Sequence, residues 1–213
     1  MTMMMAIAAL VAGCDGGNSP PPAQERAVEA GKAGKTSETG AHVAQPSSPP
    51  VAPLPRPMLV GESIARAEWA KAKAKVGCAP LALVSDAGAD GAARRAEFSG
   101  GWGVAFDLPG RRSAYGFAGP GVLPQDRAPA EAQRARLAKQ WPYRMEIDTL
   151  PAPSFAGYGL SGAQPYPTGN PEGNGMESVA YLRVGGQACT YNVWSRISRA
   201  HLEALLGHLR VLP

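Results

Sequence analysis

Histidine and cysteine are scarce in this chain, with three of each among its 213 residues. The cysteines form no C-x-x-C pair, and no histidine lies close in sequence to Cys78 or Cys189, so the ligand spacing of a zinc site is missing. The histidines of the last helical segment, His201 and His208, would lie roughly 10 Å apart along a helix and could not share one metal ion. We therefore expect neither a metal nor another cofactor.

The chain also has no large excess of either positive or negative residues. Its formal net charge is only +4, and charged residues make up 18% of the chain. A nucleic-acid-binding protein needs a clustered basic stripe with interleaved aromatic residues. Here the basic residues are dispersed through different segments, so nucleic acid is not an expected partner. Among them are Lys71, Lys73, Lys75, Arg94, Arg95, Arg111 and Arg112.

Long hydrophobic runs are missing except at the N-terminus, where Met3 to Ala12 carry no charge. This run is too short to span a bilayer core of about 30 Å, but it suits the apolar region of a signal peptide. It ends in Leu10-Val11-Ala12-Gly13-Cys14, and Val11-Ala12-Gly13-Cys14 resembles the lipobox of bacterial lipoproteins. Small residues followed by a single cysteine are the feature that carries this resemblance.

The resemblance implies that residues 1–13 are a signal peptide, that a diacylglycerol is attached to the Cys14 sulfur, and that the new N-terminus is acylated. Stable anchoring needs more than one acyl chain, and such a terminus supplies them. The resemblance also implies a protein held on the inner or outer membrane of a bacterial cell envelope, with its domain in the periplasm.

Large apolar residues are nearly absent from the segment that follows the predicted anchor. Pro, Ala, Ser, Gly and Thr dominate up to Pro57, so this segment cannot bury enough surface to offset the entropy of ordering. We predict a disordered tether over residues 14–57. Residues 58–213 are then a single globular domain, long enough for a hydrophobic core.

The patterning of that domain predicts an α+β fold, with an antiparallel sheet of about five strands and two to three helices, mainly on one face. Helices are expected over residues 62–76 and 129–140, and short strands over residues 80–84 and 145–147. A hairpin over residues 98–118 places aromatic residues on one face and small residues on the other, which would let another element approach closely. Residues 150–176 contain no periodic segment and read as a long loop rich in Pro and Gly.

The C-terminal third predicts a hairpin followed by an amphipathic helix. Residues 179–184 and 187–197 flank Gly185-Gly186, a connection suited to a two-residue turn, which would pair Leu182 with Cys189 and Ala180 with Tyr191. Ser198 can then cap a helix that carries a leucine stripe at Leu202, Leu205, Leu206 and Leu209.

Cys78 and Cys189 remain as an even pair once Cys14 is assigned to lipid. An exported domain lies in an oxidising compartment, so a disulfide between them is the expected outcome. Two free buried thiols are the alternative.

Two classes of function remain open. The first is a non-catalytic envelope module that binds a protein or cell-wall partner, with Phe155, Tyr158 and Tyr166 as its candidate binding residues, because aromatic side chains anchor interfaces. These aromatics could instead fold back to cover the sheet. The second class is a cell-wall hydrolase whose candidate groups are Asp107, Glu146 or Asp148 and a histidine of the last helix; we favour the first, because no catalytic spacing is evident.

Overall fold

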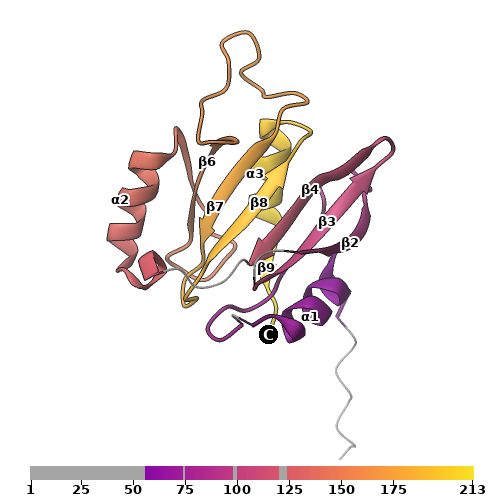
Figure 1. Ribbon diagram of the computed structural model, residues 1–213, viewed down its shortest axis with the longest axis vertical. Coiled ribbons are helices and arrows are strands. Elements are labelled where there is room, and N and C mark those ends of the chain that lie inside the picture. Colours follow the sequence, from indigo (N-terminus) through magenta and orange to yellow (C-terminus); the bar gives the residue numbers. More distant parts are fainter. Residues whose placement is uncertain (1–55, 74, 98–99, 120–123) are drawn as a thin grey trace, which may run out of the picture. The chain divides into compact units, whose positions relative to one another are not determined.

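The computed structural model describes residues 56–73, 75–97, 100–119 and 124–213. The predicted signal peptide, Cys14 and the tether up to residue 55 lie outside these ranges. The described residues belong to one compact unit of α+β class, as predicted (Figure 1). Its helices are α1 (Glu62–Lys71), η1 (Pro124–Arg127, a 3-10 helix), α2 (Ala130–Gln140) and α3 (Arg199–His208). Its strands are β1 (Leu81–Leu83), β2 (Ala92–Ala96), β3 (Trp102–Leu108), β4 (Arg111–Gly119), β5 (Tyr143–Glu146), β6 (Phe155–Leu160), β7 (Ser178–Arg183), β8 (Thr190–Ser195) and β9 (Leu209–Val211).

Seven strands form the main sheet, in the order β2-β3-β4-β8-β7-β6-β5. Every neighbouring pair is antiparallel. The sheet is larger than the predicted five strands because β2 and β6 lack the usual alternation of large apolar and polar residues. Strands β1 and β9 pair separately as a small antiparallel sheet.

The hydrophobic core lies on the face of the main sheet that α1 and α3 cover. Val104, Phe106 and Phe117 point to this side and meet α1, while Leu202, Leu205 and Leu206 of α3 pack on β7 and β8 with no exposed surface. The cap of α3 is the predicted one, because the Ser198 hydroxyl accepts a hydrogen bond of 3.1 Å from the His201 amide. We call this side the core face and the opposite side the outer face.

Helix α2 lies on the outer face, where it packs on β5 and β6 at one end of the sheet. Leu137 and Trp141 form a second small cluster there with Phe155. Gly157 allows the close approach, since a Cβ atom at this position would lie only 2.8 Å from Cδ1 of Trp141. None of the described helices covers the outer face of β2, β3 and β4, and η1 reaches only the start of β8, where Asp126 accepts hydrogen bonds from Thr190.

The register of the β7–β8 hairpin differs from the prediction. Gly185-Gly186 do form a turn, with the Gln187 amide donating to the Val184 carbonyl. The chain then turns aside, because the Ala188 amide donates to the Gly77 carbonyl instead of continuing the ladder. Leu182 therefore pairs with Tyr191 rather than with Cys189. The shift is two residues, so every side chain keeps its predicted face.

The segment 150–176 is not the continuous loop that its Pro and Gly content predicted. Its first part forms β6, an interior strand that pairs with β5 and β7. Glycine is tolerated there because Trp141 fills the space above Gly157 and Pro142 the space above Gly159. Residues 150–154 and the part after Leu160 are irregular, and the latter projects beyond the sheet (Figure 1).

None of the helices in the described ranges is long and apolar enough to cross a membrane.

Candidate functional site

An open groove of about 450 Å³ lies on the outer face of the sheet, in the part that no described helix covers. Its walls are formed by residues on or next to four strands, β2, β4, β7 and β8. Most of these strands lie far apart in sequence. Its lining residues are Arg94, Ala96, Glu97, Ser113, Glu177, Val179, Tyr181, Asn192, Trp194 and Arg196. The volume of the groove and its mixture of polar and apolar lining residues are typical of a site that binds a small ligand.

Trp194 forms the apolar floor of this groove. Its position in the register is opposite Gly116, and a Cβ atom on Gly116 would lie 2.3 Å from the indole Cζ2. The indole Nε1 donates a hydrogen bond of 3.3 Å to the Ser113 carbonyl. The small-residue side of the β3–β4 hairpin is therefore approached closely by another element, as predicted, through the Trp194 side chain of β8. The half-buried ring keeps part of its surface toward the groove.

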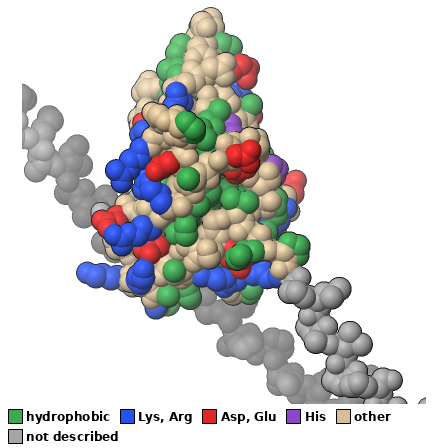
Figure 2. Space-filling model, turned by 90° about the vertical axis from the view of Figure 1, so that its right-hand side faces the viewer, with side chains coloured by type: hydrophobic (Ala, Val, Ile, Leu, Met, Phe, Trp, Pro, Cys, Tyr) green, Lys and Arg blue, Asp and Glu red, His purple; other side chains and the backbone are tan. Residues whose placement is uncertain are grey.

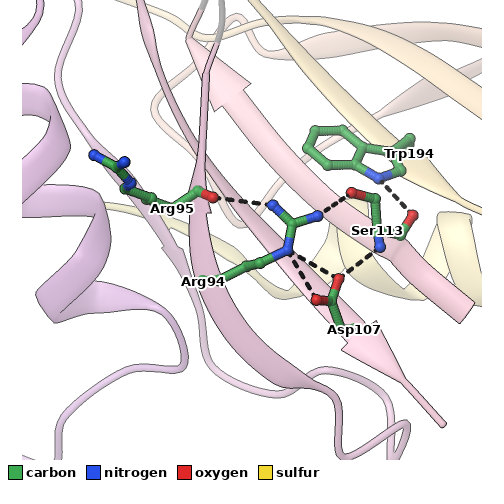
Figure 3. A network of polar contacts seen from close by, with 5 residues as sticks. All are labelled: Arg94, Arg95, Asp107, Ser113 and Trp194. Atoms are coloured by element: carbon green, nitrogen blue, oxygen red, sulfur yellow. Dashed lines mark hydrogen bonds and ion pairs between the residues drawn. The ribbon is translucent and has the colours of Figure 1, made fainter.

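A charged network fixes the β2 side of the groove (Figure 3). The Arg94 guanidinium donates through Nε to both carboxylate oxygens of Asp107, at 3.0 and 2.9 Å, and through its other nitrogens to the Ser113 hydroxyl and the Arg95 carbonyl. Asp107 also accepts a hydrogen bond of 2.6 Å from the Ser113 amide. These donors, Arg94 first, lower the pKa of the Asp107 carboxyl, so this group stays ionised at neutral pH.

Two polar atoms next to Trp194 have no hydrogen-bond partner within the described part of the chain. They are the Asn192 carbonyl oxygen Oδ1 and the Arg196 Nε, and both are shielded from solvent. The Arg196 guanidinium reaches Glu177 at 3.4 Å through its terminal nitrogen alone. Because buried polar atoms are normally paired, these two atoms are exceptions, but their lack of accessible surface keeps them out of reach of a ligand in the groove.

A second hollow of about 280 Å³ adjoins the groove, and the two share Val179 and Tyr181. Trp141 lines it, with its ring 5.4 Å from that of Tyr181, and its indole Nε1 is another shielded donor without a partner in the described chain. The two hollows therefore form an elongated surface that runs across the outer face from β2 toward α2.

The charges along the groove are balanced. Arg94 and Arg196 contribute two positive groups, and Glu97 and Glu177 contribute two negative groups. Over the side of the molecule on which β2 lies, basic and acidic side chains are likewise interspersed (Figure 2). The electrostatic potential of the groove is therefore neither strongly positive nor strongly negative.

The aromatic residues predicted as a binding surface are buried. Phe155 is 3%, Tyr158 4% and Tyr166 7% exposed. This burial agrees with the alternative interpretation, in which the three aromatic side chains cover the sheet. Phe155 lies against α2 on the outer face, whereas Tyr158 and Tyr166 lie on the core face beside Arg199. The sequence suggested exposure because these residues stand among Pro and Gly, but pairing of β6 with two neighbours places them inside.

The polar groups of that buried cluster are all used internally. The Tyr158 hydroxyl donates to Glu203, and burial together with Glu203 raises the pKa of Tyr158 to about 12. Tyr166 donates to the Ser178 hydroxyl at 3.0 Å, and Arg199 donates to Glu203 at 2.8 Å. These bonds fix Tyr158 and Tyr166 within the fold.

The structure brings Cys78 and Cys189 together. Both are buried free thiols that interact with each other, and this interaction lowers the pKa of Cys78 and raises that of Cys189. The neighbouring backbone is also joined, since the Ala79 amide donates to the Gln187 side chain at 2.7 Å. The two residues are thus neighbours, and the disulfide between them stays a prediction, because it is not formed in this structure.

The groups considered for a hydrolase are not assembled. Asp107 lies on the outer face in its pair with Arg94, Glu146 is paired with Arg134, and Asp148 is exposed in a turn. His201 lies on the core face against Tyr115, at 5.0 Å between rings. The sheet therefore separates Asp107 from this histidine.

His201 does contact a serine, but in a closed environment. The Ser195 hydroxyl lies 2.9 Å from the imidazole Nδ1, and Nε2 lies 3.1 Å from the Asp86 backbone carbonyl, to which it donates. Ser195 has no exposed surface and its oxygen also accepts from the Ile197 amide. Burial lowers the pKa of His201, so the ring is neutral and holds the start of α3 in place.

Sequence reasoning missed the groove residues of β8. Asn192, Trp194 and Arg196 alternate on one side of the strand, a period-2 signal that was present, but only the β4–β8 pairing shows that this side belongs to the outer face. No group of three or more potential metal-binding side chains occurs in the described ranges. No family model matches the chain, and no curated protein or solved structure matches it either.

Proposed function

We propose that this protein is a lipid-anchored module of the bacterial cell envelope that binds a partner in the periplasm without catalysing a reaction. Cys14 is the anchor, as the resemblance of Val11-Ala12-Gly13-Cys14 to a lipobox implies. The groove around Trp194 is the binding site. The single observation that carries this assignment is the open groove of about 450 Å³ on the outer face, which polar, charged and aromatic side chains line together.

The charged groups of the groove support binding rather than acid–base chemistry. A general acid at neutral pH needs a raised pKa, whereas Arg94 lowers the pKa of Asp107. Arg196 and Glu177 are likewise paired with each other at the other end. Groups held in this way orient a ligand through hydrogen bonds but are poor proton donors.

The anchor is tested by comparing wild type with Cys14→Ser after expression of the full chain in a bacterium that processes lipoproteins. We expect incorporation of labelled palmitate and partition into the detergent phase for wild type. The thiol is the acylation site, so Cys14→Ser should incorporate no label. Equal labelling of both would show that the anchor assignment is wrong.

Binding is tested by cross-linking the lipidated protein in its own envelope. Asn192→Ala should weaken capture of the cross-linked partner, because it truncates a polar side chain that lines the groove. Asn174→Ala is the matched control, since Asn174 is exposed in the irregular segment and does not line the groove. Capture that Asn192→Ala leaves unchanged would place the binding site elsewhere.

A further inference from the structure

The two edges of the main sheet differ in the side chains that they carry. Strand β2 is the edge at one end of the strand order and β5 the edge at the other, and each pairs with a single neighbour. An edge strand presents backbone amides and carbonyls that can pair with another chain. Whether it does so depends on the charge and shape of the side chains along the edge.

The outward backbone groups of β5 belong to Arg144 and Glu146. In the β5–β6 ladder, the Ile147 amide donates to the Ser154 carbonyl at 3.0 Å. Residues of an antiparallel strand bond alternately to one side and the other, so Met145, two positions earlier in the same register, also bonds toward β6. The amides and carbonyls of Arg144 and Glu146 therefore point away from β6, and no hydrogen bond between described residues uses them.

The side chains of this edge differ between the two faces of the sheet. Arg144 and Glu146 are exposed and lie on the outer face, where Glu146 is paired with Arg134 of α2. Tyr143 and Met145 lie on the core face, and each keeps part of its surface exposed. The β5 edge therefore combines one positive and one negative group with a partly uncovered apolar strip.

Two such edges are complementary to each other. If two β5 strands pair antiparallel about a two-fold axis at Met145, Arg144 of each strand stands directly opposite Glu146 of the other. These are the residues whose backbone groups point outward, so hydrogen bonds and opposite charges meet at the same positions. The two Met145 side chains meet on the core face and cover each other's exposed surface. Charges along an edge normally prevent pairing, but here each one meets its opposite.

The β2 edge lacks this complementarity. Arg94 and Arg95 lie in the middle of the strand, which carries no acidic residue. Two β2 strands that paired about Arg94 would place like charges directly opposite each other, which is unfavourable. Of the two edges, β5 is therefore the one that suits a second copy of the chain.

We propose that two copies of this chain associate through their β5 edges, with Met145 on the two-fold axis, so that their main sheets join into one. The axis is perpendicular to the joined sheet, so the two outer faces, each with its groove, lie on the same side. The pair then presents two grooves to one partner, which strengthens binding without a new contact in either groove. The association itself does not depend on the proposed function.

The test is disulfide cross-linking of the full chain in membranes of a bacterium that processes lipoproteins, with copper phenanthroline as the oxidation catalyst. Met145→Cys should yield a cross-linked dimer on a non-reducing gel, because directly opposed residues of this kind have Cα atoms about 4.5 Å apart, within reach of a disulfide. Wild type gives the background, and Arg95→Cys on the β2 edge is the matched control. Both should yield at least fivefold less dimer than Met145→Cys.

The register is tested through the charged pair. Arg144→Cys produced together with Glu146→Cys should cross-link at least fivefold more than Arg144→Cys alone, because two copies of position 144 face each other only diagonally, at about 7–8 Å. In the Met145→Cys background, Arg144→Glu should lower the dimer yield at least fivefold, since it opposes two acidic side chains. Adding Glu146→Arg should restore the yield, and Arg95→Glu should leave it unchanged.

Four outcomes would overturn the proposal. A Met145→Cys yield no higher than that of Arg95→Cys would exclude pairing through β5. A yield that Arg144→Glu does not lower, or that Glu146→Arg does not restore, would exclude this register. Cross-linking of Met145→Cys to a different protein in place of a second copy would assign the edge to that protein. If Met145→Cys does not fold, the combination of Arg144→Cys with Glu146→Cys decides the question, because both side chains are exposed.

Discussion

Two clusters in this domain combine aromatic rings with arginine, and they lie on opposite faces of the sheet. On the core face, Arg199 lies 4.5 Å from the ring centre of Tyr143, 6.0 Å from Tyr158 and 5.8 Å from Tyr166. On the outer face, Trp194 stands beside Arg196. The residue types are similar, but the first cluster satisfies its polar groups internally, whereas the second lines an open groove and contains buried polar atoms without partners in the described chain.

This difference separates a packing cluster from a candidate binding site. An aromatic residue stabilises a fold or a complex through the same burial of apolar area, so its presence in a sequence does not tell which of the two it serves. Accessible surface is more informative, because only an exposed group can contact a partner. The predicted trio Phe155, Tyr158 and Tyr166 fails this criterion, and the open groove meets it.

The largest expected effect tests the core-face cluster. Tyr158→Ala should lower the free energy of unfolding by about 3–5 kcal/mol, because it removes a buried aromatic side chain together with its bond to Glu203. Tyr158→Phe should cost about 1–2 kcal/mol, since only the hydroxyl is lost. Urea denaturation measures both changes. A loss below 1 kcal/mol for Tyr158→Ala would place Tyr158 outside the core and restore it as a surface residue.

The second prediction concerns the disulfide expected between Cys78 and Cys189 and its contribution to stability. If the predicted disulfide forms in periplasmic material, Cys78 and Cys189 will resist alkylation until reductant is added, and reduction should cost about 2–5 kcal/mol of stability. The structure provides the needed proximity, because the two buried thiols lie close enough to shift each other's pKa. Immediate alkylation of both thiols after unfolding without reductant would establish the free state instead.

A smaller effect concerns the pH dependence of stability on the core face. Burial lowers the pKa of His201 in the folded state, while an unfolded histidine titrates near pH 6.5. As the pH falls below about 6.5, the unfolded state takes up a proton that the folded state refuses, so stability declines by at most about 1.4 kcal/mol per pH unit.

His201→Gln removes this titration, so its stability should change less than that of wild type between about pH 7 and 5. Urea midpoints measured over this range provide the comparison. Parallel curves for the two proteins would mean that His201 ionises normally in the folded state and is not enclosed.

The smallest expected effect is at the groove. Asn192→Ala should leave the free energy of unfolding unchanged or raise it by up to about 1 kcal/mol, because the lost oxygen has no partner in the described fold. Thermal unfolding is the measurement. A clear loss of stability would mean that Asn192 is bonded within the fold, and the contrast between the two clusters would disappear.

Local features were predictable because they depend on residues close in sequence. The Ser198 cap, the leucine stripe of α3, helix α2 and the faces of the hairpins follow from capping chemistry and from periods of 3.6 or two residues. Even the two-residue error in the β7–β8 register kept the faces, since the side-chain period of a strand is two. The α+β class could therefore be derived from the sequence.

The site was decided by contacts between distant segments. Trp194 bonds to Ser113 across 81 positions, and the pairing of β4 with β8 places the indole on Gly116. Burial of Tyr158 likewise depends on β6 pairing with β5 and β7, although its sequence surroundings resemble a loop. Local patterns determine which side of an element a residue faces. Only the tertiary structure determines what covers that side, because coverage depends on which remote strand or helix packs there.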